Sequence, residues 1–237
     1  MRFRALRLKL VSIVIAGLVA GLSLATTVRV GNGTLEMPPP AGMSRITPGL
    51  RPYFQNMEAL VPPNNRLLAG FLPYADIRKA KGGEPASFEV YCMAQVMRKL
   101  EMTDISNAQF EMLKATVDET AQVQFQRLKK DADKMFASAS KHLDDGTGTN
   151  PRLSIGTVSA PTVHYRDDTS IAFSTTMDYF KDSPNGERQG YKSSMTATYL
   201  LAKRRVLFLY CYAGPDGIEQ TRGRSRAWAN DIRAANR

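Results

Sequence analysis

Apolar and polar residues alternate over several short stretches in the first part of this 237-residue chain. The stretch "SFEVYCMAQVM" at 87–97 predicts a strand, and its partly apolar second face indicates cover on both sides. The run "RLLAGFLPYADI" at 66–77 predicts another strand, interrupted at Pro73. Residues 51–62 favour a short helix, whereas the proline-containing residues 26–50 predict an irregular lead-in or an edge strand.

A helical period follows, and its start is marked by two local signals. Ser106 and Gln109 form the S-x-x-Q pattern of a capping box, and Ile105 and Phe110 occupy the positions of a hydrophobic staple. Apolar residues then recur mainly every three or four positions, which predicts one long helix over 107–143. Such a helix would be about 55 Å long, so we expect a kink, a break or an overhanging charged end.

Beyond the loop "DDGTGTNPR" at 144–152, the period changes to two. The segments at 152–165 and 169–180 predict one hairpin, and those at 190–202 and 205–213 predict a second. The last of these strands, "RVLFLYCYA", is apolar on both faces. We therefore expect it to be central in an antiparallel sheet, with layers on both sides.

The C-terminal residues 214–237 predict an amphipathic helix with Trp228 on its inner stripe. Arg222, Arg226 and Arg233 fall on another face of that helix. A cluster of this kind is a candidate surface for an anionic ligand or partner, and the alternative is an ordinary solvated helix face. Trp228 is expected to anchor the core.

The order of these elements is short strands, a long helix, two hairpins and a terminal helix. It closes with the strand "RVLFLYCY" and a helix carrying "RAWANDIRAAN". This order resembles the PsbP-like α/β/α sandwich, a fold that small exported bacterial proteins use, over residues 33–236. The resemblance implies an α+β fold with an antiparallel sheet flanked by helices, and it implies no activity.

The N-terminus predicts export. Four basic residues lie within the first nine, and the next charge is Arg29. The apolar stretch Val11–Leu22 has the length of a signal-peptide core, and Ser23-Leu24-Ala25 supplies small residues for cleavage after Ala25. We therefore predict a signal peptide over 1–25 and a single exported α+β domain over 26–237, periplasmic or secreted.

The alternative is an uncleaved inner-membrane anchor, since the uncharged window Leu10–Val28 is just long enough to span a bilayer. In both cases the basic cluster stays in the cytoplasm and the rest of the chain is exported. The leader holds four of the basic residues and no acidic one, so +6 of the net charge of +10 remains without it. This mild excess favours anionic partners in general and singles out none. We expect an envelope protein or an anionic membrane surface as partner, because the exported location and the lack of a strong basic stripe with interleaved aromatics argue against nucleic acid.

The sequence contains no motif for catalysis, a metal or a cofactor. Its two histidines, His142 and His164, lie apart, and neither an H-E-x-x-H nor a C-x-x-C pattern occurs. We therefore predict no catalytic, metal-binding or cofactor-binding residues. Cys92 and Cys211 predict either one disulfide or two buried thiols.

Together these observations predict an exported, non-enzymatic binding or interaction protein. Its partner site is expected between the sheet and the long helix. Two alternatives stay open: a membrane-anchored structural envelope protein, and a hydrolase whose site is too dispersed to see in sequence. The pattern leaves the ligand and the oligomeric state open.

Overall fold

The computed structural model describes residues 26–84, 86–87, 89–117, 152–182 and 187–237. The predicted leader and its cleavage site after Ala25 thus lie outside or at the edge of the described residues. Within these ranges, no helix combines the length and the apolar composition that crossing a membrane requires. The described part is a strand-rich α+β fold with antiparallel pairing, as the sequence predicts.

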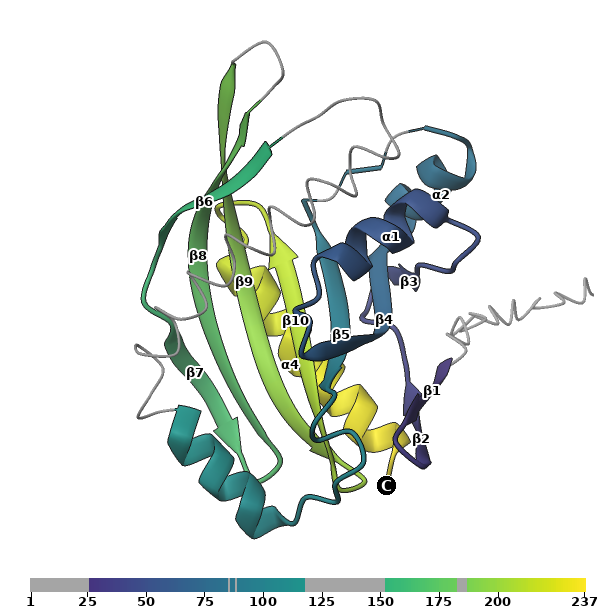
Figure 1. Ribbon diagram of the computed structural model, residues 1–237, viewed down its shortest axis with the longest axis vertical. Coiled ribbons are helices and arrows are strands. Elements are labelled where there is room, and N and C mark those ends of the chain that lie inside the picture. The colour runs from purple at the N-terminus through teal and green to yellow at the C-terminus, as the bar shows by residue number, and fades with distance from the viewer. Residues whose placement is uncertain (1–25, 85, 88, 118–151, 183–186) are drawn as a thin grey trace, which may run out of the picture.

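The main sheet contains eight strands (Figure 1). They are β3 Met43–Arg45, β4 Asn65–Pro73, β5 Tyr91–Met97, β6 Arg152–Val158, β7 Thr162–Asp167, β8 Ser170–Asp182, β9 Arg188–Ala202 and β10 Arg205–Ala213. Their order across the sheet is β3-β4-β5-β10-β9-β8-β6, with β7 also paired to β8. β10 therefore lies between β5 and β9, which confirms the prediction that the last strand is central.

The two predicted hairpins are present, and one differs in detail. β9 and β10 are joined by Lys203 and Arg204, both with positive φ, as a two-residue hairpin turn requires. The single strand expected over 152–165 is divided into β6 and β7, which pair with successive halves of β8. Pro161, which has no backbone N–H, lies in the break.

The lead-in is more regular than the sequence predicts. β1 Thr26–Val30 and β2 Gly33–Met37 form a separate two-stranded hairpin, so the irregular structure expected there is wrong. The alternative of an edge strand is found, since β2 belongs to this hairpin and β3 lies at the edge of the main sheet. The three prolines follow only after β2 ends, where no ladder is needed. Gly31, with a φ of +58°, supplies the left-handed backbone of the turn.

Three helices have both ends among the described residues: α1 Arg51–Ala59, α2 Tyr74–Lys81 and α4 Ile218–Ala235. α1 confirms the short helix expected over 51–62. α2 replaces the end of the strand expected over 66–77, because β4 stops at Pro73 and that residue occupies the N-cap position of α2.

The capping box at the start of the long helix is also confirmed. The backbone N–H of Gln109 donates to Ser106 Oγ at 3.2 Å, and the N–H of Ser106 donates to Gln109 Oε1 at 2.8 Å. Ile105 and Phe110 are both buried, as the staple predicts. The helix is described from Asn107 to Val117, and the remainder of the predicted 107–143 helix lies outside the described residues.

Helices lie on both faces of the main sheet. Trp228 of α4 meets the ring of Phe71 edge-on, with centroids 5.3 Å apart. The preceding residue, Gly70, faces Met57 of α1 so closely that a Cβ would lie 2.0 Å from the sulfur. Because neighbouring residues of a strand point to opposite faces, α4 and α1 lie on opposite sides of β4.

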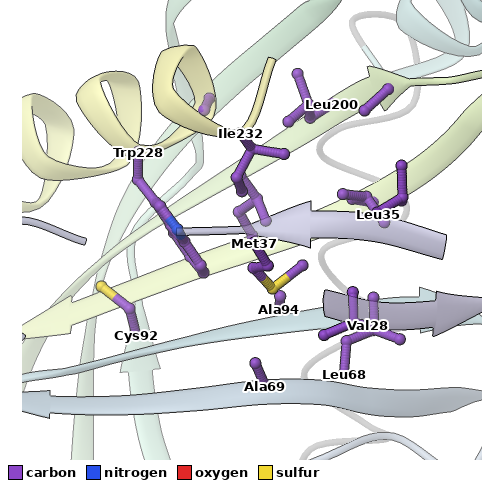
Figure 2. Close-up of a cluster of buried hydrophobic side chains, with 14 of the residues drawn as sticks. Val28, Leu35, Met37, Leu68, Ala69, Cys92, Ala94, Leu200, Trp228 and Ile232 are labelled. Atoms are coloured by element: carbon purple, nitrogen blue, oxygen red, sulfur yellow. The ribbon is translucent and has the colours of Figure 1, made fainter. Parts of the chain in front are cut away.

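The core on the α4 side joins the small hairpin to the sheet (Figure 2). Val28, Met37, Leu68, Trp228 and Ile232 are all at most 6% exposed and pack in one cluster. These residues come from β1, β2, β4 and α4. This cluster fixes α4 on the sheet, and with it the arginine residues that the sequence singles out.

Candidate functional site

The predicted arginine surface lies along the seam between α4 and the hairpin formed by β7 and β8. Arg233 Nη1 donates to Asp167 Oδ2 at 2.8 Å and to Thr169 Oγ1 at 2.8 Å. Asp167 also accepts from the hydroxyls of Tyr165 and Ser170. This carboxylate therefore lies at the centre of the turn between β7 and β8, and it links that turn to α4.

The electrostatics of Asp167 reflect these contacts. Burial alone would raise its pKa, but hydrogen bonds from Tyr165, Arg233 and Ser170 outweigh burial and hold the pKa well below the usual range. The same turn is held from another side by Lys114, which is 1% exposed and donates Nζ to the backbone carbonyl of Asp167. Two helices thus hold one hairpin turn.

The other two arginines also contact their own chain. Arg222 Nε donates to Ser174 Oγ at 3.2 Å, and its Nη1 pairs with Glu219 at 2.6 Å. The guanidinium of Arg226 lies 4.4 Å from the centroid of the Tyr165 ring, in cation–π geometry. Both side chains therefore help to attach the hairpin to α4.

Arg222, Arg226 and Arg233 are thus on one side of α4, as the sequence predicts, but each already has a partner in the described residues. Anion binding by this surface stays a prediction, and it would compete with these contacts. The fourth arginine of α4, Arg224, is half-buried on the other side of the helix. Its Nη1 has no hydrogen-bond partner in the described part of the chain, and burial lowers its pKa.

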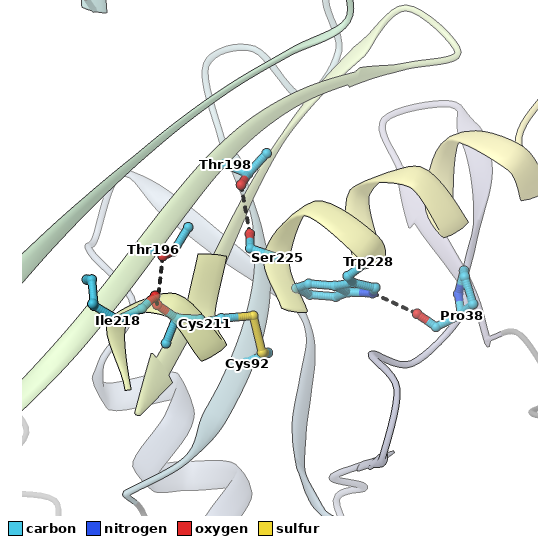
Figure 3. Close-up of a disulfide and its surroundings, with 9 residues drawn as sticks. Pro38, Cys92, Thr196, Thr198, Cys211, Ile218, Ser225 and Trp228 are labelled. Atoms are coloured by element: carbon cyan, nitrogen blue, oxygen red, sulfur yellow. Dashed lines mark hydrogen bonds between the residues drawn. A yellow bond between two sulfur atoms is a disulfide. The ribbon is translucent and has the colours of Figure 1, made fainter. Parts of the chain in front are cut away.

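A chain of buried hydroxyls runs through the seam (Figure 3 shows part of it). His164 Nδ1 lies 3.1 Å from Ser174 Oγ, which lies 2.9 Å from Thr196 Oγ1, and Thr196 lies 2.8 Å from Thr221 Oγ1. Thr221 donates to the carbonyl of Ile218. Because the Thr221 proton is used in this way, Thr196 donates to Thr221 and Ser174 donates to Thr196. Ser174 then accepts from His164, which carries its proton on Nδ1. Its Nε2 is buried and has no partner among the described residues.

The contact between His164 and Ser174 has the residue types of a nucleophile and its base, but other features of the pair do not fit that role. Ser174 is 2% exposed, and its oxygen also accepts from Arg222. Nothing in the described residues orients the second nitrogen of His164. The seam therefore holds β7 and β8 against α4 and presents no exposed nucleophile.

Cys92 and Cys211 are directly opposite each other in the pairing of β5 with β10, and they form a disulfide (Figure 3). Both are fully buried beneath α4, close to Trp228. Of the two alternatives that the sequence leaves open, the structure has the disulfide. The bridge joins two central strands across 119 positions of sequence.

The opposite face of the sheet carries a second candidate site, which we call the tyrosine face. It is defined by six half-buried tyrosines on β5, β8, β9 and β10: Tyr91, Tyr179, Tyr191, Tyr199, Tyr210 and Tyr212. They are assigned to one side by strand register, which aligns three rows across the sheet. These rows are Ile171–Tyr199–Phe208–Gln95, Phe173–Ala197–Tyr210–Met93 and Thr175–Met195–Tyr212–Tyr91.

The aromatic rings on this face contact one another in ordered pairs. Tyr91 and Tyr212 stack with centroids 4.4 Å apart and planes inclined by 15°, and Tyr179 and Tyr191 stack at 5.4 Å and 14°. Tyr199 meets Phe208 edge-on at 4.6 Å. Such stacked and edge-on contacts orient the rings on the sheet beyond what burial alone would do.

The environment of these tyrosines disfavours charge. Burial raises the pKa of Tyr199 to about 12, and it raises the pKa values of Tyr91, Tyr210 and Tyr212 further. Each of these residues keeps part of its surface exposed, but Tyr91, Tyr210 and Tyr212 also pack against the buried cluster that contains Met57 of α1. The raised pKa values therefore indicate a largely buried, weakly polar environment.

The tyrosine face is adjacent to the start of the predicted long helix. Phe110 and Leu113 of that helix pack with Tyr199, Phe208 and Tyr210 in one cluster. The sequence predicts a partner site between the sheet and this helix, but no pattern in it distinguishes the six tyrosines. Alternation along a strand predicts which tyrosines lie on the same side of that strand. Only the pairing of β5, β10, β9 and β8 shows that tyrosines from different strands lie on one face of the sheet.

The described residues contain no group of three histidine, cysteine, aspartate or glutamate side chains placed to hold a metal ion. No family model matches this chain, and no curated protein matches it either. The candidate sites are therefore defined by geometry and chemistry alone.

Proposed function

We propose that this chain is an exported, non-enzymatic binding protein whose ligand binds at the tyrosine face. The observation that carries the proposal is the set of six half-buried tyrosines aligned on one side of four neighbouring strands. Tyrosine is enriched at binding surfaces because it offers a large rigid ring and a polar hydroxyl at low cost in side-chain entropy. The helices on both faces of the sheet are also compatible with the PsbP-like arrangement that the sequence resembles.

One feature supports export. The disulfide between Cys92 and Cys211 belongs to the chemistry of oxidising compartments outside the cytoplasm. We therefore propose a periplasmic or secreted location with the leader cleaved, and a single-pass inner-membrane anchor as the alternative.

Binding is tested by native mass spectrometry of the protein purified from its own envelope fraction. We expect a non-covalently bound molecule that Tyr212→Ala loses and that Tyr74→Ala retains. Tyr74 is the matched control because it is 50% exposed at the start of α2, outside the tyrosine face. A bound molecule retained equally by both variants, or no bound molecule in the unaltered protein, would contradict the proposal.

Export is tested separately by sequencing the N-terminus of the same preparation. We expect Thr26 as the first residue. An intact Met1 in the membrane fraction would instead support the anchor alternative, and a cytoplasmic location with reduced cysteines would contradict export altogether.

A further inference from the structure

The end of the molecule where β10 begins carries a concentration of positive charge. The β1–β2 turn, residues 98–104 after β5 and the β9–β10 turn all lie at this end (the lower end in Figure 1). We call it the basic end and define it by its charged residues, which are Arg29, Arg66, Arg98, Lys99, Lys203, Arg204 and Arg205, with Glu101 and Asp104. Seven basic residues minus two acidic ones give it a net charge of +5, against +6 for all of residues 26–237.

Hydrogen bonds and ion pairs join these segments into one surface. Arg66 Nη2 donates to the backbone carbonyl of Arg29 at 2.8 Å, and the same side chain pairs with Glu101. Across the basic end, Asp104 pairs with Arg205 at 3.0 Å. Both carboxylates are thus engaged by arginines that are only 33% and 13% exposed, and they hold the three segments together.

The other basic side chains of this end are exposed. Arg29, Arg98, Lys99 and Lys203 form no ion pair with any residue in the described ranges. Other charged segments of the molecule are balanced: residues 74–89 around α2 and residues 178–192 of β8 and β9 each contain three basic and three acidic residues. The excess of positive charge is therefore local to the basic end, where it attracts anions.

The β9–β10 turn places two of these cations on a strained backbone. Lys203 and Arg204 have φ values of +44° and +63°. Two successive left-handed residues form the turn for which Asn-Gly is the preferred sequence, because other side chains are strained there. Turn formation alone therefore does not account for two cations at the tip, and strain of this kind is typical of functional segments.

An exposed methionine lies among the charges. Met102 is 61% exposed, and a Cβ added to Gly31 would lie 3.3 Å from its sulfur, so this side chain is beside the β1–β2 turn. Cations around an exposed apolar side chain match an anionic bilayer, whose phosphates attract the charges while its interface takes up the apolar group. A soluble acidic polymer would engage the charges only.

From the local charge, the strained turn and the exposed methionine together, we propose that the basic end docks on a bilayer that contains anionic phospholipids. Turns that project from one end of a sheet can contact a flat surface at the same time, and each exposed cation adds to the attraction. No residue of the tyrosine face belongs to the basic end. This second surface therefore goes beyond the proposed function and does not depend on it.

The experiment is vesicle flotation of the protein purified from its own envelope fraction. Vesicles of equal parts phosphatidylglycerol and phosphatidylcholine are compared with vesicles of phosphatidylcholine alone. We expect binding to the anionic vesicles to be at least about tenfold tighter and to weaken as salt is added, because salt screens exposed charges. The N-terminus is the same in every sample, so differences between variants report on the folded part.

A double variant in the turn separates charge from folding. Lys203→Asn with Arg204→Gly removes two cations and supplies the preferred turn sequence, so it should lower the affinity for anionic vesicles about tenfold without loss of stability. Urea unfolding followed by the emission of Trp228, the single tryptophan and fully buried, measures that stability.

The matched control removes the same charge elsewhere. Lys79 and Lys81 are exposed on α2, at the opposite end of β4 from Arg66. Lys79→Gln with Lys81→Gln should change the affinity for anionic vesicles by less than about twofold, because salt screens charges far from the docked surface. An equal loss in this control and in the turn variant would overturn the proposal.

The contribution of the methionine distinguishes a bilayer from a soluble polyanion. Met102→Ser should lower the affinity for anionic vesicles about threefold at every salt concentration, since the lost contact is apolar. Val163→Ser, at a position 38% exposed on β7, is the control and should have no effect.

Two further results would contradict docking on a bilayer. Equal binding to neutral and anionic vesicles, or no binding to either, would overturn the proposal. If Met102→Ser has no effect and polyglutamate binds as tightly as the anionic vesicles, the basic end binds an acidic polymer instead. Neither result bears on the tyrosine face, for which mass spectrometry of the native protein is the test.

Discussion

Arg233 Nη1 lies 2.8 Å from Asp167 Oδ2, and this contact joins the last turns of α4 to the turn between β7 and β8. The two residues are 66 positions apart in sequence. Arg233 is 36% exposed and Asp167 26%, so water screens the pair only in part. The contact is the clearest link between the C-terminal helix and the outer hairpin, and it gives the first stability prediction.

Breaking this pair should destabilise the protein measurably. Asp167→Asn removes the charge from a carboxylate that accepts hydrogen bonds from four residues, which are Tyr165, Thr169, Ser170 and Arg233. We expect the free energy of unfolding to fall by about 1–3 kcal/mol. Urea unfolding followed by Trp228 emission measures it. In a double-mutant cycle with Arg233→Gln, we expect a coupling of about 1 kcal/mol; additive effects would mean that the pair contributes nothing directly.

The lowered pKa of Asp167 predicts a dependence of stability on acid. A carboxylate whose pKa is lower in the folded state stabilises the fold above its ordinary pKa of 3.8, and loses that contribution as the pH falls further. Between about pH 5 and pH 2, the unaltered protein should therefore lose more stability than Asp167→Asn. Parallel curves for the two proteins would show that Asp167 titrates normally. Asp168→Asn is the matched control, because Asp168 is the next residue in the chain, is exposed and is not part of the seam.

His164 predicts a second pH effect, in a different range. Burial lowers its pKa below 6.5, and Arg222 and Arg226 lower it further, while the Thr162 backbone and Glu219 oppose them. The folded state therefore binds this proton less readily than the unfolded state. Stability should be fully present above about pH 6.5 and decline as the pH falls below it.

The comparison of His164→Asn with the unaltered protein isolates this effect. Asparagine can occupy the place of the Nδ1 donor without titrating, so its curve should be flatter between pH 7.5 and pH 5. His142→Asn is the control, since His142 is the only other histidine. An equal slope in His164→Asn and the unaltered protein would contradict the prediction.

The disulfide gives a prediction that needs no assumption about function. A thiol assay of the denatured, non-reduced protein should detect no reactive cysteine, since Cys92 and Cys211 are bridged. Reduction, or Cys92→Ala with Cys211→Ala, should lower the free energy of unfolding by up to about 4–5 kcal/mol in the chain-entropy account. Two reactive thiols in the protein isolated from the envelope would contradict both the bridge and the support that it gives to export.

Local structure followed from the sequence wherever the physical cause was itself local. The capping box of Ser106 and Gln109 is made by residues three positions apart, and the helix begins where that spacing predicts. The apolar alternation on both sides of β10 likewise predicted a central strand. The prediction of irregular structure failed at the start of 26–50, because Pro38–Pro40 prevent a strand only after Met37 and the β1–β2 pairing precedes them.

The candidate sites depended instead on which strands are neighbours. The sequence placed Arg222, Arg226 and Arg233 on one side of a helix, but only the position of the β7–β8 hairpin showed that they have partners there. It left Cys92 and Cys211 either free or bridged, and the register of β5 with β10 placed them directly opposite each other.

By itself, then, the sequence determined many of the elements, the central strand and the side of a strand or helix on which a residue lies, although it missed the β1–β2 hairpin and α2. Those properties depend on periods of two and 3.6 that are written within each segment. Only the tertiary structure decided that six tyrosines from four strands lie on one side of the sheet and that three arginines hold a hairpin. These contacts join residues far apart in the chain, and no local period encodes which strand will pair with which.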